Sequence, residues 1–271
     1  MNFDDHLEQN FRIKLQYNYY GGWGYDTPEP TDRFLNKLTQ TLPKRGVEIM
    51  RATGATIYPC AKMSDTSHQY AGAMAQMTDR DTMPAICEMQ FSNIIIARDY
   101  KDSSGEWRET ENPAFIAMHE LGHVIDSTLG VYVPDGAGDA HKEPSTRAYS
   151  YVQDAYKQDM AMKSEAQKLT EKFTLYRDDL LGGDDVNRDD ASEIMCDLIA
   201  HELTGHNPQT FEALKDAHPH LMDVARVMIT AAKTKEGQNL FRDMAGKDAS
   251  FAEIKAAIVP PQPSQTPHRR P

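Results

Sequence analysis

The sequence predicts an α+β fold, with a small mixed sheet first and a mostly helical half after it. Candidate strands lie before residue 110, and apolar residues at three- and four-residue spacing dominate after residue 112. A hydrophobic content of 39% with 26% charged residues is typical of a soluble globular protein. We expect one domain over residues 1–258, with the sheet in about 1–110, the helices in about 112–258, and a disordered proline-rich tail over 259–271.

The N-terminal part is predicted to contain a glycine-rich turn and an interrupted helix. Aromatic residues and glycines crowd the segment 17–25, which favours strands joined by a turn. Thr31 and Asp32 are capping residues, and they predict the start of a helix that breaks at Pro43 and resumes over residues 47–50. Two strands should follow. Residues 55–58 form one candidate, and residues 86–98 form the strongest one.

The helical half is predicted from caps and apolar spacing. Asn112 followed by Pro113 indicates the start of a buried helix of about four turns, and Gly130 stands where a left-handed C-terminal residue would end it. A helical pattern extends from residue 145 almost to 181, with a kink or break expected near 158–164. Further helices are expected over residues 189–203 and from Pro208, Pro219 and Ser250.

The first of these helices carries a HExxH motif, His119-Glu120-Leu121-Gly122-His123. Side chains four apart lie on the same face of an α-helix, so His119 and His123 can bind one metal ion together. Glu120 lies about 100° further round the helix, where it can reach a water molecule on that metal. The motif therefore predicts a zinc site built for hydrolysis, provided that a third ligand is present.

A second helix offers that ligand. Glu193, Asp197 and His201 recur at steps of four beside an apolar face. A carboxylate at Glu193 would complete a site of two histidines and one glutamate, and Asp197 would hydrogen-bond the outer nitrogen of a ligating histidine. The metzincin continuation of the motif is absent, because no third histidine follows closely after His123. We expect one Zn²⁺ ion per chain.

These motifs resemble those of a known family. Glu193 and Asp197, placed after HExxH, resemble the ExxxD helix of thermolysin-like gluzincins, and the string around His119 resembles the catalytic domain of anthrax lethal factor and related bacterial proteases. The resemblance implies a zincin-like metalloprotease fold and zinc-dependent endopeptidase activity. It also implies that Glu120 is the catalytic base, that His119, His123 and Glu193 are ligands, and that Asp197 orients a ligating histidine.

The donor that would stabilise the oxyanion of the reaction is left open. Lethal-factor-like proteases carry a tyrosine about two turns before the ligand glutamate, where this chain has Val186. The candidates in this sequence are Tyr149, Tyr151 and Tyr156, which follow the HExxH segment, and His201, which lies on the stripe of Glu193.

A strand is expected to bind the substrate. In zincin folds, a strand just before the active-site helix forms the edge of the sheet and binds an extended peptide as an added strand. We assign this role to Asn93, Ile94, Ile95, Ile96 and Ala97. A central strand without substrate contact fits the same residues equally well.

Composition limits the partners. A net charge of -12 and a pI near 5.3 argue against nucleic acid and anionic membranes. The N-terminus lacks the features of a Sec signal, and no apolar run reaches 18 residues. The odd set of Cys60, Cys87 and Cys196 suggests reduced thiols.

We therefore expect a protease of the bacterial cytoplasm, or an effector secreted without a cleaved Sec signal that acts on a host protein. Two further interpretations remain: a catalytically inactive zinc-binding interaction protein, and a cytoplasmic regulatory processing protease. The oligomeric state is not predicted.

Overall fold

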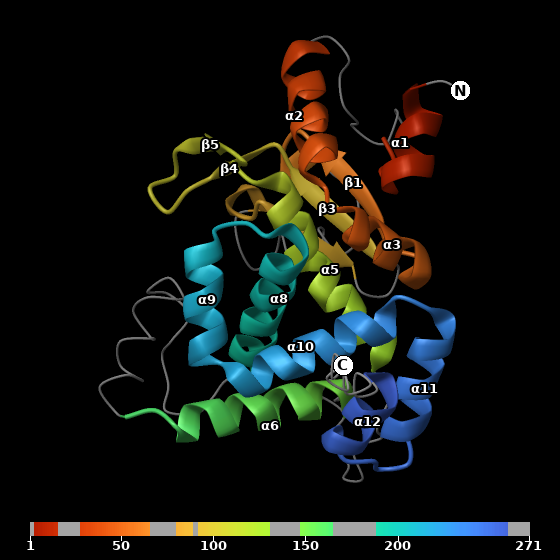
Figure 1. Ribbon diagram of the computed structural model, residues 1–271. Helices are drawn as coiled ribbons and strands as arrows, with labels where there is room; N and C mark the ends of the chain where they lie inside the picture. Colours follow the sequence, from red (N-terminus) through yellow and green to blue (C-terminus); the bar gives the residue numbers. More distant parts are fainter. Residues whose placement is uncertain are drawn as a thin grey trace, which may run out of the picture.

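The computed structural model describes residues 3–15, 28–65, 80–88, 92–130, 147–164 and 188–259. Within them the chain is mixed α+β, with a small sheet and a mostly helical second half, as predicted (Figure 1). The first half contains α1 (Phe3–Phe11), α2 (Pro28–Thr41), α3 (Lys44–Thr53), β1 (Thr56–Cys60), β2 (Ala85–Glu88), β3 (Asn93–Ala97), β4 (Asp99–Lys101) and β5 (Trp107–Glu109). The second half contains α5 (Pro113–Leu129), α6 (Arg147–Ala161), α8 (Arg188–Thr204), α9 (Pro208–Ala217), α10 (Pro219–Ala232), α11 (Lys235–Ala245) and α12 (Phe251–Ile258).

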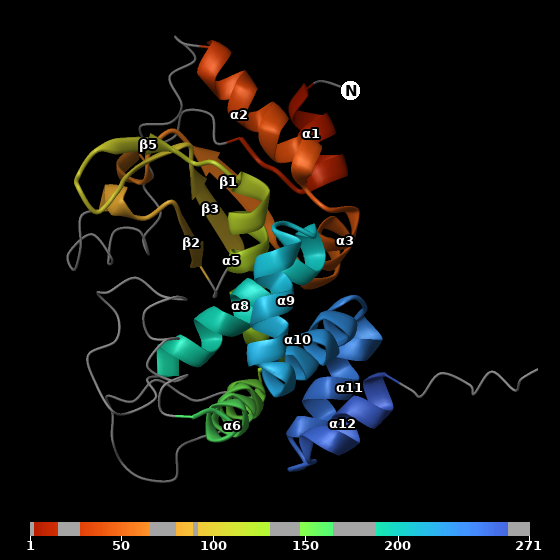
Figure 2. The same ribbon diagram turned by 60° about the vertical axis from the view of Figure 1, so that its left-hand side comes forward.

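The three-stranded sheet has the order β1-β3-β2, so the prediction that residues 93–97 form an edge strand is wrong (Figure 2). β3 is parallel to β1, with Thr56 opposite Asn93, and antiparallel to β2, with Ala85 opposite Ile96. Ile94, Ile95 and Ile96 are all buried, and a strand with apolar residues on both faces favours the middle of a sheet. The strand predicted over residues 86–98 is in fact two strands, β2 and β3.

Most predicted helices are confirmed, with local corrections. The helix expected to be capped by Thr31 and Asp32 begins earlier, at Pro28, because proline is well suited to the first turn. Gly130 is extended (φ -60°, ψ 134°) and not left-handed; its N–H still bonds to the carbonyl of Asp126 and ends α5. The helix predicted from residue 145 ends at Ala161, inside the expected break.

Within the described residues, two α-helices were not predicted, and other predictions lie outside the described residues. These two helices are α1 and α11. The sequence does contain a capping residue for α11, because the side chain of Thr234 accepts a hydrogen bond from the N–H of Gly237. The helices predicted from Pro208, Pro219 and Ser250 are present, and Ser250 forms a capping box with Glu253. The structure does not describe the expected turn over 17–25, the helical pattern over 165–181 or the tail from residue 260.

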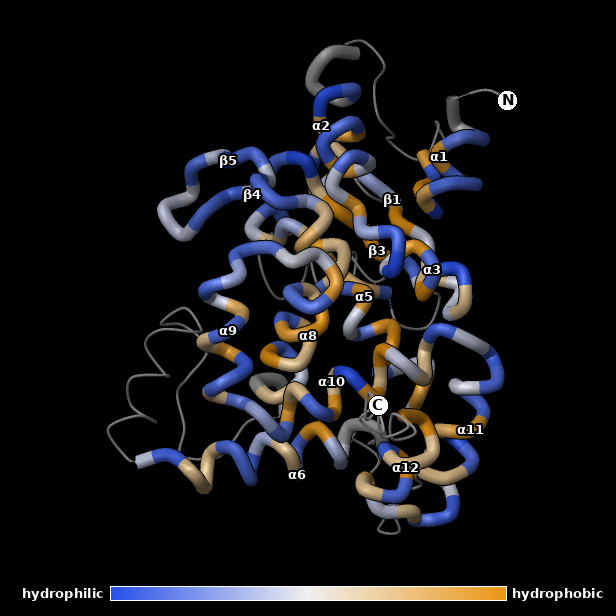
Figure 3. The backbone as a smooth tube through the Cα atoms, viewed as in Figure 1, coloured by the Kyte–Doolittle hydropathy of each residue, from blue (hydrophilic) through white to orange (hydrophobic). Residues whose placement is uncertain are grey.

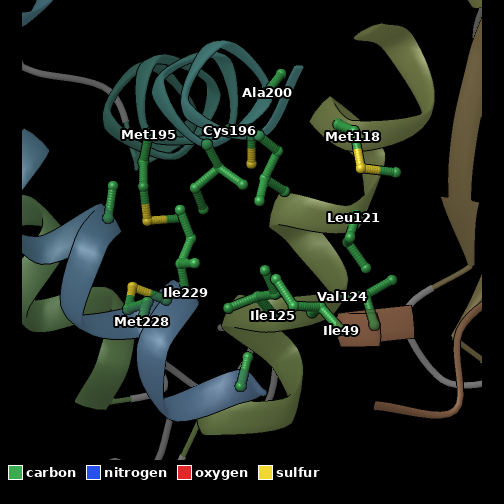
Figure 4. Close-up of a cluster of buried hydrophobic side chains, with 14 of the residues drawn as sticks. Ile49, Met118, Leu121, Val124, Ile125, Met195, Cys196, Ala200, Met228 and Ile229 are labelled. Atoms are coloured by element: carbon green, nitrogen blue, oxygen red, sulfur yellow. The ribbon is translucent and has the colours of Figure 1, made fainter. Parts of the chain in front are cut away.

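Helix α5 is the centre of the molecule. It packs against β2 and β3 on one side and against α8 and α10 on the other (Figures 1 and 2). Leu121, Val124 and Ile125 of α5 are fully buried among side chains of α3, α8 and α10, including Ile49, Cys196 and Ile229 (Figure 4). Each buried aliphatic side chain of this kind contributes about 1.5–3 kcal/mol. The core therefore fixes α5 against α8.

The hydrophobic residues concentrate where these elements meet. In Figure 3 the hairpin of β4 and β5 is mostly hydrophilic, whereas parts of α5 and α8 in the middle are strongly hydrophobic. Cys60, Cys87 and Cys196 are all buried, and none of them is in a disulfide. Among the described helices, none is both long and apolar enough to cross a membrane.

Candidate metal centre

The structure brings four predicted site residues together from α5 and α8. The Nε2 atom of His119 lies 3.0 Å from Oε2 of Glu193, and Nε2 of His123 lies 3.3 Å from Oε1 of the same carboxylate. Asp197, one turn after Glu193, contacts the other side of the His119 ring, with 2.7 Å between Oδ1 and Nδ1. The i, i+4 spacing on each helix is what places these side chains face to face.

The arrangement fits a zinc ion. One ligand atom from each of His119, His123 and Glu193 lies within 4.8 Å of the other two, and no other such group occurs among the described residues. Zinc bonds to nitrogen and oxygen measure about 2.0–2.2 Å, so two ligand atoms in a tetrahedral site lie roughly 3.3–3.6 Å apart. The observed separations of 3.0 and 3.3 Å are close to that value. These three residues can therefore hold a metal ion with little movement.

In the metal-free chain, protons on His119 and His123 balance the negative charge of the neighbouring carboxylates. Burial alone would lower the pKa of His119, but hydrogen bonds to Asp197 and then to Glu193 outweigh it, and the pKa is well above its usual value. His123 follows the same pattern: burial would lower its pKa, and the bond to Glu193 raises it. Burial would raise the pKa of Glu193, but the two histidines hold it far below its ordinary value. A metal ion would replace the protons on the two Nε2 atoms.

Glu120 lies beside the cluster without joining the ligand set. Burial raises the pKa of its carboxyl, and the charges of His119 and then His123 oppose the rise. A partly buried carboxylate close to two imidazoles and offset round the helix has the position and the raised proton affinity of a general base.

Gly122 allows α5 and α8 to approach closely. A Cβ atom built on Gly122 would lie 2.9 Å from Cα of Cys196 and 2.7 Å from its Sγ, so no larger residue fits without movement of the backbone. The glycine between the two histidines of the motif therefore sets the spacing of the helices that carry the ligands. A glycine inside a strongly helical segment was the signal for such a contact in the sequence.

Cys196 is a member of the site that the sequence did not reveal. It is fully buried, as expected for a core residue, but its Sγ also lies 3.4 Å from Nδ1 of His123. It cannot join the metal ligands, because Nδ1 and Nε2 are on opposite sides of the imidazole ring. Burial, followed by the nearby charge of Glu193, raises the pKa of the thiol well above its usual value.

A pocket of about 490 Å³ adjoins the cluster on the Asp197 side. Its lining includes Ile116 of α5, Tyr100 of β4 and His201 of α8. His201, an oxyanion candidate, is nearly buried, and its Nδ1 contacts the backbone carbonyl of His206 at 2.8 Å. Two helical turns, roughly 12 Å, separate it from Glu193. This places His201 in the pocket and away from the metal ligands.

The three tyrosine candidates for the oxyanion donor, Tyr149, Tyr151 and Tyr156, all belong to α6. The hydroxyl of Tyr151 donates a hydrogen bond of 2.7 Å to the carbonyl of Ala249, just before α12. Tyr156 is buried and stacks on the ring of His218. The side chain of Tyr149 is outside the described residues. The oxyanion donor stays unassigned.

Strand β2, which the sequence did not separate from β3, packs against α5, the helix that carries Glu120. Cys87 on β2 is buried, and this burial is the main cause that raises the pKa of its thiol; the charge of Glu120 is the second cause. β2 is also the antiparallel outer strand of the sheet and packs against α5. The side of the sheet next to the candidate centre is therefore formed by β2.

Comparisons with protein-family models, curated proteins and solved structures find no match to this chain.

Proposed function

We propose that the protein is a zinc-dependent endopeptidase of the gluzincin type with a zincin-like fold. One observation carries the proposal: the side chains of His119, His123 and Glu193 converge at the spacing of zinc ligands, with Asp197 behind one histidine and Glu120 beside them. The resemblance of the HExxH and ExxxD motifs to those of gluzincins supports the same reaction. A purely structural zinc site would have no use for the carboxyl group of Glu120 next to its ligands.

In this proposal, each residue has a separate task. His119, His123 and Glu193 hold the metal, and Asp197 fixes the tautomer of His119 by accepting its Nδ1–H. A zinc ion held by these residues would supply a coordinated water molecule with a pKa of about 7 and a positive charge for the carbonyl of a peptide bond. Glu120 takes the proton from the attacking water and passes it to the leaving amine.

A protein substrate is proposed to bind in extended form along β2 (Ala85–Glu88). This strand replaces residues 93–97 in that role, because β3 already has a neighbour on each side. β2 lies next to Glu120, and its outer side has no strand partner among the described residues. The pocket beside Asp197 would then accept a side chain of the substrate.

The test compares zinc-loaded wild type with Glu120→Gln. We expect both proteins to bind one equivalent of zinc, because Glu120 is outside the ligand set, and turnover to fall at least about 100-fold without the base. His123→Ala should lose both zinc and activity. The readout is N-terminal peptide profiling of bacterial and host-cell lysates after incubation with each protein. Glu109→Gln, the same exchange at an exposed residue of β5, serves as the control.

Each result has a definite meaning. Cleavage that survives in Glu120→Gln would refute the assignment of the base. One equivalent of zinc without any cleavage, even of denatured proteins, would favour the inactive interaction protein. Cleavage of one bacterial protein would favour a cytoplasmic processing protease, and selective cleavage of a host protein would favour an effector.

A further inference from the structure

The two histidines of the motif have different neighbours at Nδ1, the ring nitrogen that faces away from Glu193. Nδ1 of His119 has the carboxylate of Asp197 at 2.7 Å, whereas Nδ1 of His123 has the sulfur of Cys196 at 3.4 Å. A histidine that binds a metal through Nε2 keeps its proton on Nδ1, and that proton needs an acceptor. For His123, which is mostly buried, the neighbouring group is a thiol.

We propose that Cys196 is the positioning residue of His123: its Sγ accepts the Nδ1–H and holds the ring with Nε2 directed at Glu193. This inference rests on the proposed metal site and gives a role to a position that the motifs HExxH and ExxxD leave unspecified. Cys196 acts through His123 and is not a ligand itself. The sulfur and the metal position lie on opposite sides of the imidazole ring, with Nε2 of His123 3.3 Å from Oε1 of Glu193.

The packing of the helices fixes the sulfur in this position. A Cβ on Gly122, the residue before His123, would lie 2.9 Å from Cα of Cys196 and 3.0 Å from its Cβ. The backbones of α5 and α8 therefore meet at Gly122 and Cys196, and Figure 4 shows Cys196 on α8 among the side chains between these helices. A small side chain is required there, and cysteine supplies an acceptor in little space.

A neutral thiol beside His123 also adds no further negative charge to a site that already has several carboxyl groups. Glu120, Glu193 and Asp197 already place three carboxyl groups around the two histidines. A second carboxylate behind His123 would add another buried charge, which is costly to desolvate. A neutral thiol is a weak acceptor that orients the ring without adding charge.

Cys196→Ala and Cys196→Ser test this role, with Cys60→Ala as the matched control. Cys60 is also buried and outside any disulfide, and it lies in the separate small cluster around Met63 and Ile95. Zinc affinity is measured by competition with a chelator. We expect Cys196→Ala to lose about 10–100-fold in zinc affinity, the usual effect of removing a partner of a ligating histidine. Cys196→Ser, whose hydroxyl can accept the same proton, should recover most of it, and Cys60→Ala should match wild type.

A second measurement uses folded wild type and does not depend on the variants. The ¹H–¹⁵N spectrum of the histidine rings in the zinc-loaded protein should show a slowly exchanging Nδ1–H on His123. Absorption of the cobalt-substituted protein should lack a thiolate-to-metal charge-transfer band, because Cys196 is not a ligand. Unchanged zinc affinity in Cys196→Ala, a His123 protonated on Nε2, or such a charge-transfer band would overturn the inference.

The proposed function and this inference can fail separately. Wild type that binds no zinc would overturn the metal site and, with it, the role of Cys196. Wild type that binds zinc and cleaves proteins, together with an unaffected Cys196→Ala, would overturn only the inference. Zinc binding that depends on Cys196 without any proteolysis would support the inference and refute the endopeptidase.

Discussion

Asp197 contacts His119, a proposed metal ligand, with 2.7 Å between Oδ1 and Nδ1. Its effect on metal binding depends on the partners of both nitrogens of the His119 ring. His119 contacts a carboxylate at each nitrogen, with Glu193 at Nε2 and Asp197 at Nδ1. If a metal ion took the place of the proton on Nε2, the proton on Nδ1 would stay and Asp197 would be its acceptor. In the proposed metal-bound state, Asp197 would therefore orient His119.

Asp197→Asn should weaken zinc binding by about 10–100-fold while the chain remains folded. The amide keeps the shape of the carboxylate, but it lacks the charge that stabilises a donating imidazole. Chelator competition measures the affinity. Asp223→Asn, on the outer side of α10 where Asp223 pairs with Lys255, is the control and should match wild type. Equal zinc affinity in Asp197→Asn and the control would contradict this role.

At the residue scale, the sequence predicted those site residues whose partners follow from helical spacing. His119 with His123, and Glu193 with Asp197, each lie four positions apart, so one helix fixes the relative direction of each pair. Cys196 could not be predicted in this way. Its contact with His123 depends on how far α8 is rotated and how closely it approaches α5, and neither quantity can be read from one helix.

At the scale of elements, the site depends on the close contact of α5 with α8. Alanine normally stabilises a helix interior relative to glycine by up to about 1 kcal/mol. At position 122 the added Cβ would meet the backbone of Cys196 at 2.9 Å, and the helix cannot give way as a flexible side chain would. The two helices would have to separate, which would carry Glu193 away from the histidines.

Gly122→Ala should therefore lower the free energy of unfolding by about 1–3 kcal/mol, the usual cost of overpacking a core. It should weaken zinc binding as well. Denaturant unfolding and chelator competition measure the two effects. In the control Gly205→Ala, the new methyl group meets open space but the residue has φ of +64°. That control should lose about 1 kcal/mol from strain and keep its zinc affinity. A Gly122→Ala protein with normal zinc affinity would show that this contact does not set the site.

The order of strands shows what local patterns leave undetermined. The buried run Ile94–Ile96 predicted a strand correctly, but it fits an edge and a centre equally well from sequence alone. The partners of β3 come from β1, more than thirty residues earlier, and from β2. Strand order is a property of the whole sheet, so the position of β3 between β1 and β2 cannot be read from the residues of β3 alone.

At the scale of the whole molecule, acidic groups exceed basic ones both overall and around the site. The net charge is -12. Glu120, Glu193 and Asp197 surround two histidines, and the protons on those histidines stabilise the metal-free cluster. A divalent cation would supply the same positive charge without depending on pH. The stabilities of the metal-free and zinc-loaded proteins should therefore respond differently to pH.

The sign of that response follows from the pKa shifts. The pKa values of His119 and His123 are raised in the folded metal-free chain, so their contribution to stability is complete below the unfolded value of about 6.5 and is lost as pH rises through the folded values. The raised pKa of Glu120 acts in the same direction, because ionisation is opposed in the folded chain above about pH 4.5. Glu193, with its lowered pKa, loses its contribution only in acid.

The metal-free protein should thus become less stable from pH 6 to pH 8.5, and the gain in Tm on adding zinc should increase over the same range. Zinc binds the neutral histidines, so fewer protons have to leave as pH rises. In a protein of this size each 1 kcal/mol shifts Tm by roughly 2–4 °C, and zinc at 100 times its Kd adds about 2.7 kcal/mol. Thermal melts with excess zinc or with a chelator give the comparison, and His123→Ala should show almost no gain at any pH. A zinc-induced gain that is the same at pH 6 and pH 8.5 in wild type would mean that binding does not displace protons from His119 and His123, and the ligand assignment would have to be revised.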